Sequence, residues 1–328
     1  MTRIRAPYRL GMFQDYAPRT IAFISRIRAA VADVRARDIL IDFHRCSFIS
    51  RAACLLITAE LERGRHLCNG CISFVPPADD ELADFFDAFG VYSYFRVASP
   101  LSPSQRRARR KNSLVVRSDG PSAKGDVFEI EEVASVALKV CGEERLARSV
   151  EEALQEALWN AKEHAYADMD PNSLPDSRWW FAGLYDPEAQ EAFFYALDHG
   201  QGIPRRAQTT MRTEVEAFLG TTLTSPNLSP EQATDRDLLR AAIRAPRLNV
   251  EGRGKGLPTM VGLADHALDG EVRIYSGRAM WHGRRRKKAD AAGSRTFERC
   301  YHLKREFPGT LVYWRVSGPV PHDPEGST

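Results

Sequence analysis

The chain has 328 residues, which is enough for two domains of ordinary size. Its 46 Lys and Arg residues and 43 Asp and Glu residues leave a net charge of +3, which is too balanced to indicate nucleic-acid binding by the chain as a whole. No run approaches the ~18–20 apolar residues of a membrane span, and the first residues lack the apolar core of a signal peptide, so we expect a cytoplasmic protein that does not enter a membrane.

The first hundred residues alternate between helical and extended patterns. Apolar spacing predicts helices over residues 16–35, 51–63 and 79–89, and strands over 38–43 and 71–75. Elements that alternate in this way form a small α/β layer. The fold class expected for this part of the chain is therefore α/β.

The segment from Ile39 to Leu56 resembles the core of a STAS domain, the fold of sulfate-transporter tails and anti-sigma-factor antagonists. The resemblance implies a STAS-like domain over residues 1–96. Phosphorylated STAS domains carry a hydroxyl residue where this chain has Arg51, directly after Ser50. This departure argues against self-phosphorylation at the usual site and favours Ser50 as a helix cap. It implies a domain that docks a protein partner or a second copy of the chain.

The six cysteines are scattered along the chain, which predicts reduced thiols in the cytoplasm. Cys68-Asn-Gly-Cys71 is the one closely spaced pair. Zinc would need two further ligands, and no second pair stands at matching spacing. Metal or redox use of the pair is the alternative interpretation, and a turn at Asn69 and Gly70 is the favoured one.

A Pro- and Ser-containing stretch with a basic run, residues 97–113, is interpreted as a linker. The run itself is 106–111, and a second one covers 284–288. Either could contact phosphates, but the Ser, Gly and Ala residues around them favour a solvated linker and a hairpin tip. No aromatic residues interleave with them, so nucleic acid is not expected as a partner. Residues 319–328 are rich in Pro and Gly and are predicted to be a disordered tail.

Residues 145–167 carry apolar side chains every three or four positions, which predicts an amphipathic helix. Glu156, Asn160 and His164 fall at i, i+4 and i+8, close to one line along that helix. Glu156 could act as a general base for a water molecule, and the amide oxygen of Asn160 could bind Mg²⁺. The alternative is a solvated polar stripe.

The apolar run 192–197 predicts a buried strand that ends at Asp198, and Gly200 and Gly202 follow. A carboxylate at a strand end can accept a hydrogen bond from an exocyclic amine, and glycines let the backbone approach a flat ring. The alternative is a turn in which the Asp side chain bonds its own backbone.

A glycine-rich loop with two cations precedes an apolar run that predicts a helix. It consists of Gly252, Arg253, Gly254, Lys255 and Gly256. Backbone N–H groups at the start of a helix favour anions, and the two side chains add full positive charges. The alternative is a flexible loop with two solvated cations.

In this order, the three segments resemble the N, G1 and G2 boxes of the gyrase, histidine kinase and MutL ATPase superfamily (GHKL). The patterns are Glu-x-x-x-Asn-Ala-x-x-His, Asp-x-Gly-x-Gly-Ile and Gly-x-Gly-x-Gly-Leu. Gly309-Thr310 and the apolar run after it resemble the Gly-Thr and strand that close this fold. The resemblance covers residues 114–318. It implies a Bergerat-type ATPase domain, a mixed sheet layered with helices, and hence an α+β arrangement after the STAS-like domain.

The resemblance also implies ATP and Mg²⁺ as ligands. Glu156 would activate the hydrolytic water, and Asn160 would hold Mg²⁺. Asp198 would accept a hydrogen bond from the adenine amino group, with Thr310 nearby. The glycines would shape the adenine pocket and wrap the phosphates: Gly200, Gly202, Gly252, Gly254 and Gly256.

Three further expectations concern the surroundings of these boxes. Phosphate contacts of Arg253 and Lys255 follow from their charge alone, because the family does not fix them. His164 resembles the His of anti-sigma-factor kinases, whereas Glu163 stands where many histidine kinases carry a cation, and would repel phosphate if it pointed inward. Residues 203–251 correspond to the ATP lid, with a helix predicted over 235–245.

Three functions are compatible with these residues. The favoured one is an ATP-driven conformational switch with slow hydrolysis, in bacterial signalling or defence. The second is a serine/threonine kinase of the anti-sigma-factor type that acts on a STAS partner in trans. The third is a nucleotide-gated binding module without catalysis.

Overall fold

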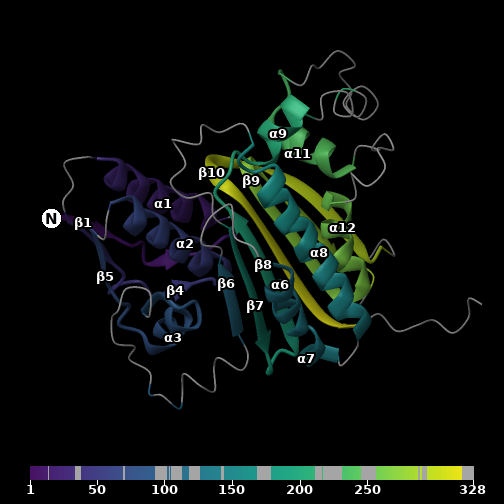
Figure 1. Ribbon diagram of the computed structural model, residues 1–328, viewed down its shortest axis with the longest axis horizontal. Helices are drawn as coiled ribbons and strands as arrows, with labels where there is room; N and C mark the ends of the chain where they lie inside the picture. Colours follow the sequence, from purple (N-terminus) through teal and green to yellow (C-terminus); the bar gives the residue numbers. More distant parts are fainter. Residues whose placement is uncertain are drawn as a thin grey trace, which may run out of the picture. The chain divides into compact units, whose positions relative to one another are not determined.

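A computed structural model describes residues 1–13, 15–33, 38–68, 71–92, 102, 104, 113–117, 126–141, 144–167, 179–210, 216, 231–244, 256–286, 289 and 294–319 (Figure 1). The chain forms two compact units, one from Met1 to Val115 and one from Val116 to Asp170 and from Ser177 to Thr328. The fold is mixed α/β, with both parallel and antiparallel sheets. No helix of the described residues is long and apolar enough to cross a membrane.

The first unit has a parallel three-stranded sheet in the order β1-β3-β5 and a parallel pair, β2-β4. Its strands are β1 (Thr2–Arg5), β2 (Arg9–Leu10), β3 (Ile39–Asp42), β4 (Phe48–Ile49) and β5 (Ile72–Val75). Its helices are α1 (Ala17–Ala32), α2 (Arg51–Leu67) and α3 (Asp80–Ala88). The predicted α/β alternation is therefore present, and its helix and strand limits are shifted by a few residues.

Helix ends in this unit follow from their capping residues. The hydroxyl of Ser50 accepts a hydrogen bond from the backbone N–H of Ala53, which is the predicted capping role. The carboxylate of Asp79 accepts from Glu81 and Leu82 at the start of α3. Each cap satisfies N–H groups that have no partner inside the helix.

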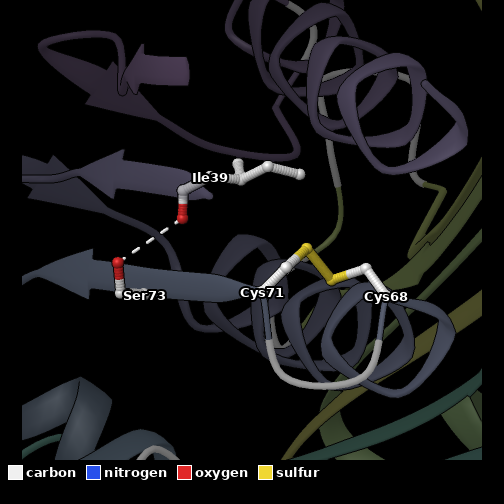
Figure 2. Close-up of a disulfide and its surroundings, with 4 residues drawn as sticks. All are labelled: Ile39, Cys68, Cys71 and Ser73. Atoms are coloured by element: carbon white, nitrogen blue, oxygen red, sulfur yellow. Dashed lines mark hydrogen bonds between the residues drawn. A yellow bond between two sulfur atoms is a disulfide. The ribbon is translucent and has the colours of Figure 1, made fainter. Parts of the chain in front are cut away.

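The prediction that the cysteines are all reduced thiols is wrong for one pair, because Cys68 and Cys71 are joined by a disulfide (Figure 2). Their Cα atoms are 5.4 Å apart, well within disulfide reach. The favoured turn interpretation of the pair did not include a disulfide, and redox use was only the alternative; the end of α2 brings the two cysteines together. The predicted turn at residues 69–70 lies outside the described residues.

The sheet of the second unit has the strand order β6-β7-β8-β10-β9, in which β7, β8, β10 and β9 pair antiparallel; its first strand, β6, begins three residues before the unit boundary. Its strands are β6 (Ser113–Arg117), β7 (Trp179–Asp186), β8 (Glu191–Asp198), β9 (Ala267–Arg285) and β10 (Thr296–Pro319). Its helices are α6 (Asp126–Ser135), α7 (Leu138–Cys141), α8 (Glu144–Glu163), α9 (Ile203–Thr210), α11 (Asp235–Arg244) and α12 (Gly256–Gly262), with a 3-10 turn, η2 (Leu263–His266).

Helices α6, α8 and α12 lie over one face of this sheet (Figure 1). The apolar line predicted for α8 is buried, from Leu146 to Ala161. The indole N–H of Trp314 on β10 donates to the backbone oxygen of Met260 at 2.7 Å, which connects α12 to the sheet. The helix predicted over 235–245 is α11, which ends at Arg244.

Both long strands bend at a glycine. Gly277 of β9 has φ +57° and Gly309 of β10 has φ +107°, values that favour glycine over any residue with a Cβ atom. The strand register shifts at the same place, on both sides of Phe307. The bends fall where β9 and β10 approach the end of β8, beside Asp198.

Candidate functional site

Asp198 is the last residue of β8 and lies opposite Thr310 of β10. Both side chains are buried, with 9% and 8% of their residue surface exposed. The carboxylate of Asp198 accepts a hydrogen bond from the backbone N–H of Gly200 at 2.8 Å. The turn interpretation of this segment is therefore correct, and the turn still holds the carboxyl group at the end of the strand.

Burial raises the pKa of Asp198 to about 6. Hydrogen bonds from the backbone of Gly200 and from the backbone and hydroxyl of Thr310 act in the opposite direction. Desolvation is thus the stronger influence on this carboxyl group. An Asp of this kind gains from a ligand that donates a hydrogen bond to it.

The two glycines after Asp198 are required by close contacts. Gly202 has φ +84°, and a Cβ atom there would lie 2.9 Å from the hydroxyl of Ser276. A Cβ atom on Gly200 would collide with the backbone oxygen of Ala165. Any side chain at either position would push the turn away from its neighbours.

The same turn is fastened to the end of α8. The backbone N–H of Gln201 donates to the oxygen of Ala165 at 2.8 Å, and its side-chain amide donates to the oxygen of His164 at 3.1 Å. The hydroxyl of Tyr166 accepts from the backbone N–H of His199 at 3.0 Å. The segment from Asp198 to Gly202 is therefore connected to the end of α8, the helix that carries Glu156 and Asn160.

Gly256, the first residue of α12, lies directly against the polar line of α8. A Cβ atom on Gly256 would lie 2.9 Å from a carboxylate oxygen of Glu156 and 3.2 Å from the side-chain nitrogen of Asn160. The third motif thus ends, at Gly256, beside Glu156 and Asn160 of the first motif. Segments separated by about a hundred residues meet at this point.

The side-chain nitrogen of Asn160 is buried and has no hydrogen-bond partner among the described residues. A buried amide without a partner is rare and points to an absent ligand or water. The amide oxygen and nitrogen can exchange places by a rotation, so this group can offer a donor to phosphate or an acceptor to a hard cation. Such a side chain suits the magnesium–nucleotide pair that the resemblance of the motifs implies.

His164 follows the last residue of α8, and its Nδ1 atom lies 3.2 Å from a guanidinium nitrogen of Arg206 on α9. Arg206 was not among the residues predicted for the site, although it stands four residues after Gly202. Glu163 is exposed on the surface of the second unit. The repulsion expected for an inward-pointing Glu163 therefore does not arise.

Ser276 of β9 is the second residue that the sequence argument missed. Its hydroxyl is fully buried, accepts from the backbone N–H of Ile203 at 2.8 Å and lies 3.2 Å from the hydroxyl of Thr310 and from the backbone oxygen of Gly309. The only signal in the sequence is the step from Ser276 to Gly277 inside β9, because a glycine inside a strand marks a bend or a close approach.

Several predicted residues lie outside the described part of the chain. These are Gly252, Arg253, Gly254 and Lys255, the basic run 106–111, residues 287–288 and the tail beyond Pro319. Within the second basic run, Arg284 is paired with Asp269, and Arg285 donates to the backbone of Asp265. Among the described residues, no cluster of three His, Cys, Asp or Glu side chains could hold a metal ion.

Comparison with protein-family models gives no match, and comparison with curated proteins gives none. The family expectation therefore rests on the three motifs and on the contacts between them.

Proposed function

We propose that this chain is a GHKL-type ATP-driven switch that binds Mg–ATP in its second unit and hydrolyses it slowly. The observation that carries the proposal is the contact of Gly256 with Glu156 and Asn160. Residues of the expected first and third boxes meet there, although nothing in their local sequences requires it. The side-chain nitrogen of Asn160, which is buried and has no hydrogen-bond partner among the described residues, is a second support.

Each residue has a role that its position supports. Asp198, buried beside Thr310, would accept a hydrogen bond from the adenine amino group. Asn160 would bind the magnesium ion or a phosphate oxygen. Glu156, on the same line of α8, would take a proton from the attacking water. Mg–ATP supplies the phosphoanhydride whose cleavage resets the switch.

The first unit would be the part that recognises a partner. A parallel α/β layer with α2 directly after Ser50 supports a STAS-like domain, and Arg51 at the usual acceptor position favours docking over self-phosphorylation. A bacterial signalling or defence role in the cytoplasm, with a protein partner or a second copy of the chain, follows from this proposal. A kinase that phosphorylates a STAS partner in trans is the alternative.

The test uses the full chain and Mg–ATP labelled on the γ-phosphate. We expect free phosphate to be released, and release to be lost in Glu156→Ala while nucleotide binding persists. Glu163→Ala is the matched control, because Glu163 lies on the same helix but is exposed. It should hydrolyse ATP at the normal rate.

Two other outcomes are informative. Binding without phosphate release would favour the kinase, which would then transfer label to an added STAS protein. If the natural chain, in which Asp198 is intact, binds ATP no better than Asp198→Asn and neither binds it measurably, the proposal is wrong.

A further inference from the structure

The disulfide of the first unit joins two elements at their ends. Cys68 is the residue after α2, and its backbone N–H still donates to the oxygen of Gly64 at 3.0 Å. Cys71 is the residue before β5, and its backbone oxygen accepts from Ile39 of β3 at 2.9 Å. Figure 2 shows the disulfide beside the sheet, where the hydroxyl of Ser73 donates a hydrogen bond to the backbone oxygen of Ile39.

The backbone holds both cysteines whether or not the sulfurs are bonded. One belongs to the hydrogen-bonded end of a helix and the other to a paired strand, and the N–H of Cys71 also donates to the oxygen of Cys68 at 3.2 Å. The two thiols would therefore stay close together after reduction. Each thiol is then present at a high effective concentration near the other, which favours re-formation of the disulfide.

The bridge contributes little as a cross-link. Only two residues separate the cysteines, so the disulfide removes far less freedom from the unfolded chain than one that closes a long loop. The unit also has its own buried core, in which α2 and β3 take part. Reduction should therefore leave the unit folded.

The described free cysteines are poorly suited to exchange with this pair. Burial raises the pKa of Cys46 to about 11, and it raises the pKa of Cys54 still further. Burial likewise raises the pKa of Cys300 to about 12. Thiolates are the reactive form, so these three thiols should be inert near neutral pH. Cys68 and Cys71 are both half-buried rather than buried.

We propose that Cys68 and Cys71 form a reversible thiol–disulfide exchange site whose co-substrate is a dithiol, either a small molecule or a protein. A thiolate of the dithiol attacks one sulfur, the bond between Cys68 and Cys71 breaks, and a mixed disulfide forms. The second thiol of the dithiol then displaces the protein sulfur. The chain gains two electrons and two protons, and the dithiol leaves as a disulfide.

The position of the pair gives the exchange a direction. Cys68 lies at the C-terminal end of α2, where the helix dipole disfavours a negative charge. Cys71 lies at the start of a strand and has no such penalty. The better leaving group is therefore Cys71, and the incoming thiolate attacks Cys68.

The test equilibrates the full chain with mixtures of reduced and oxidised dithiothreitol, quenches with acid and labels free thiols with a maleimide that adds mass. We expect Cys68 and Cys71 to be labelled together or not at all, along a two-electron transition, with an unchanged circular dichroism spectrum. In Cys68→Ser and Cys71→Ser the remaining thiol should be labelled at every ratio. Cys300→Ser is the control and should titrate like the natural chain.

Two outcomes would overturn the proposal. If the bridge opens only when urea is added, it is a fixed structural disulfide. If both thiols are labelled at every ratio, no bridge forms. The direction has its own readout, because in the reduced protein an alkylating agent should modify Cys71 roughly two- to fivefold faster than Cys68. Faster modification of Cys68 would reverse the assignment of the leaving group.

Discussion

The hydroxyl of Ser276 lies 3.2 Å from the hydroxyl of Thr310, and the same oxygen accepts the backbone N–H of Ile203. One buried side chain thus joins β9, β10 and the start of α9. Thr310 in turn lies opposite Asp198 and bonds to its carboxyl group. Ser276 therefore contacts Thr310, which in turn contacts Asp198, the residue that we expect to bind the base of the nucleotide.

Ser276→Ala should weaken this arrangement in two ways. The N–H of Ile203 would lose its partner, so the free energy of unfolding should fall by about 1–3 kcal/mol. The hydroxyl of Thr310 would lose its contact with Ser276 and would hold Asp198 less firmly. The preference for ATP over GTP should therefore fall as well. Urea unfolding and titration with both nucleotides would measure the two effects.

The control for this prediction is Ser317→Ala, which removes a half-buried hydroxyl near the C-terminal end of β10. It should leave the ratio of ATP to GTP affinity unchanged. If Ser276→Ala loses stability but keeps that ratio, its hydroxyl supports the fold and does not position the site.

Gly256→Ala should impair the site while leaving α12 intact. The new methyl group would lie within 3.2 Å of both Glu156 and Asn160, whose side chains would have to turn away. We expect at least a tenfold loss of Mg–ATP affinity, which corresponds to about 1.4 kcal/mol. Titration calorimetry with Mg–ATP would measure this loss.

The same helix offers a matched control. Gly262 ends α12, and a Cβ atom there would meet no atom within 4 Å. Gly262→Ala should therefore bind Mg–ATP normally and change stability by less than about 1 kcal/mol, because alanine favours a helix. Equal losses of affinity in the two variants would contradict the special role of Gly256.

Local sequence was enough to predict α8 and β8, but it did not predict the long strand β9. The apolar spacing of α8 and the continuous apolar run at residues 192–197 of β8 identified both elements, although the helix predicted over 145–167 ends at Glu163. Strand β1 was missed because Thr2–Arg5 is short and carries two charged residues. Helix α6, which follows the linker predicted over residues 97–113, was not predicted.

Contacts between distant segments could not be predicted in the same way. The motifs suggested that Glu156, Asn160 and Gly256 share a site, but only the packing of α12 on α8 brings them within contact distance. Ser276 and Arg206 had no motif at all. Each acquires its importance from a partner far away in the sequence, Thr310 in one case and His164 in the other.

The carboxyl group of Asp198 should make stability depend on pH. Its pKa is raised from 3.8 to about 6 in the folded chain, so the folded chain binds the proton more tightly than the unfolded one. The contribution of Asp198 to the free energy of unfolding is therefore fully present below pH 3.8. It is lost as the pH rises through 6, by an amount on the order of 3 kcal/mol. Urea unfolding between pH 4 and 7.5 should show this slope, and Asp198→Asn should lack it. Equal slopes would mean that the carboxyl group is not desolvated.

Glu271 of β9 should have the opposite effect. Burial alone would raise its pKa, but a hydrogen bond from His282 and the charges of Arg273, His282 and Arg315 outweigh burial and lower the pKa from 4.5 to about 2. The contribution of Glu271 to the free energy of unfolding is therefore fully present above pH 4.5. It is lost as the pH falls through 2, by about 3 kcal/mol.

Replacing Glu271 tests this network directly. Glu271→Gln leaves the buried cations without their shared carboxylate, so at pH 7 the free energy of unfolding should fall by about 3 kcal/mol. The variant should also lose less stability than the natural chain between pH 4.5 and 2. Glu188→Gln is the control, because Glu188 is exposed in the turn between β7 and β8, and its effect should stay within about 0.5 kcal/mol. A Glu271→Gln chain as stable as the control at pH 7 would show that the cations do not need this carboxylate.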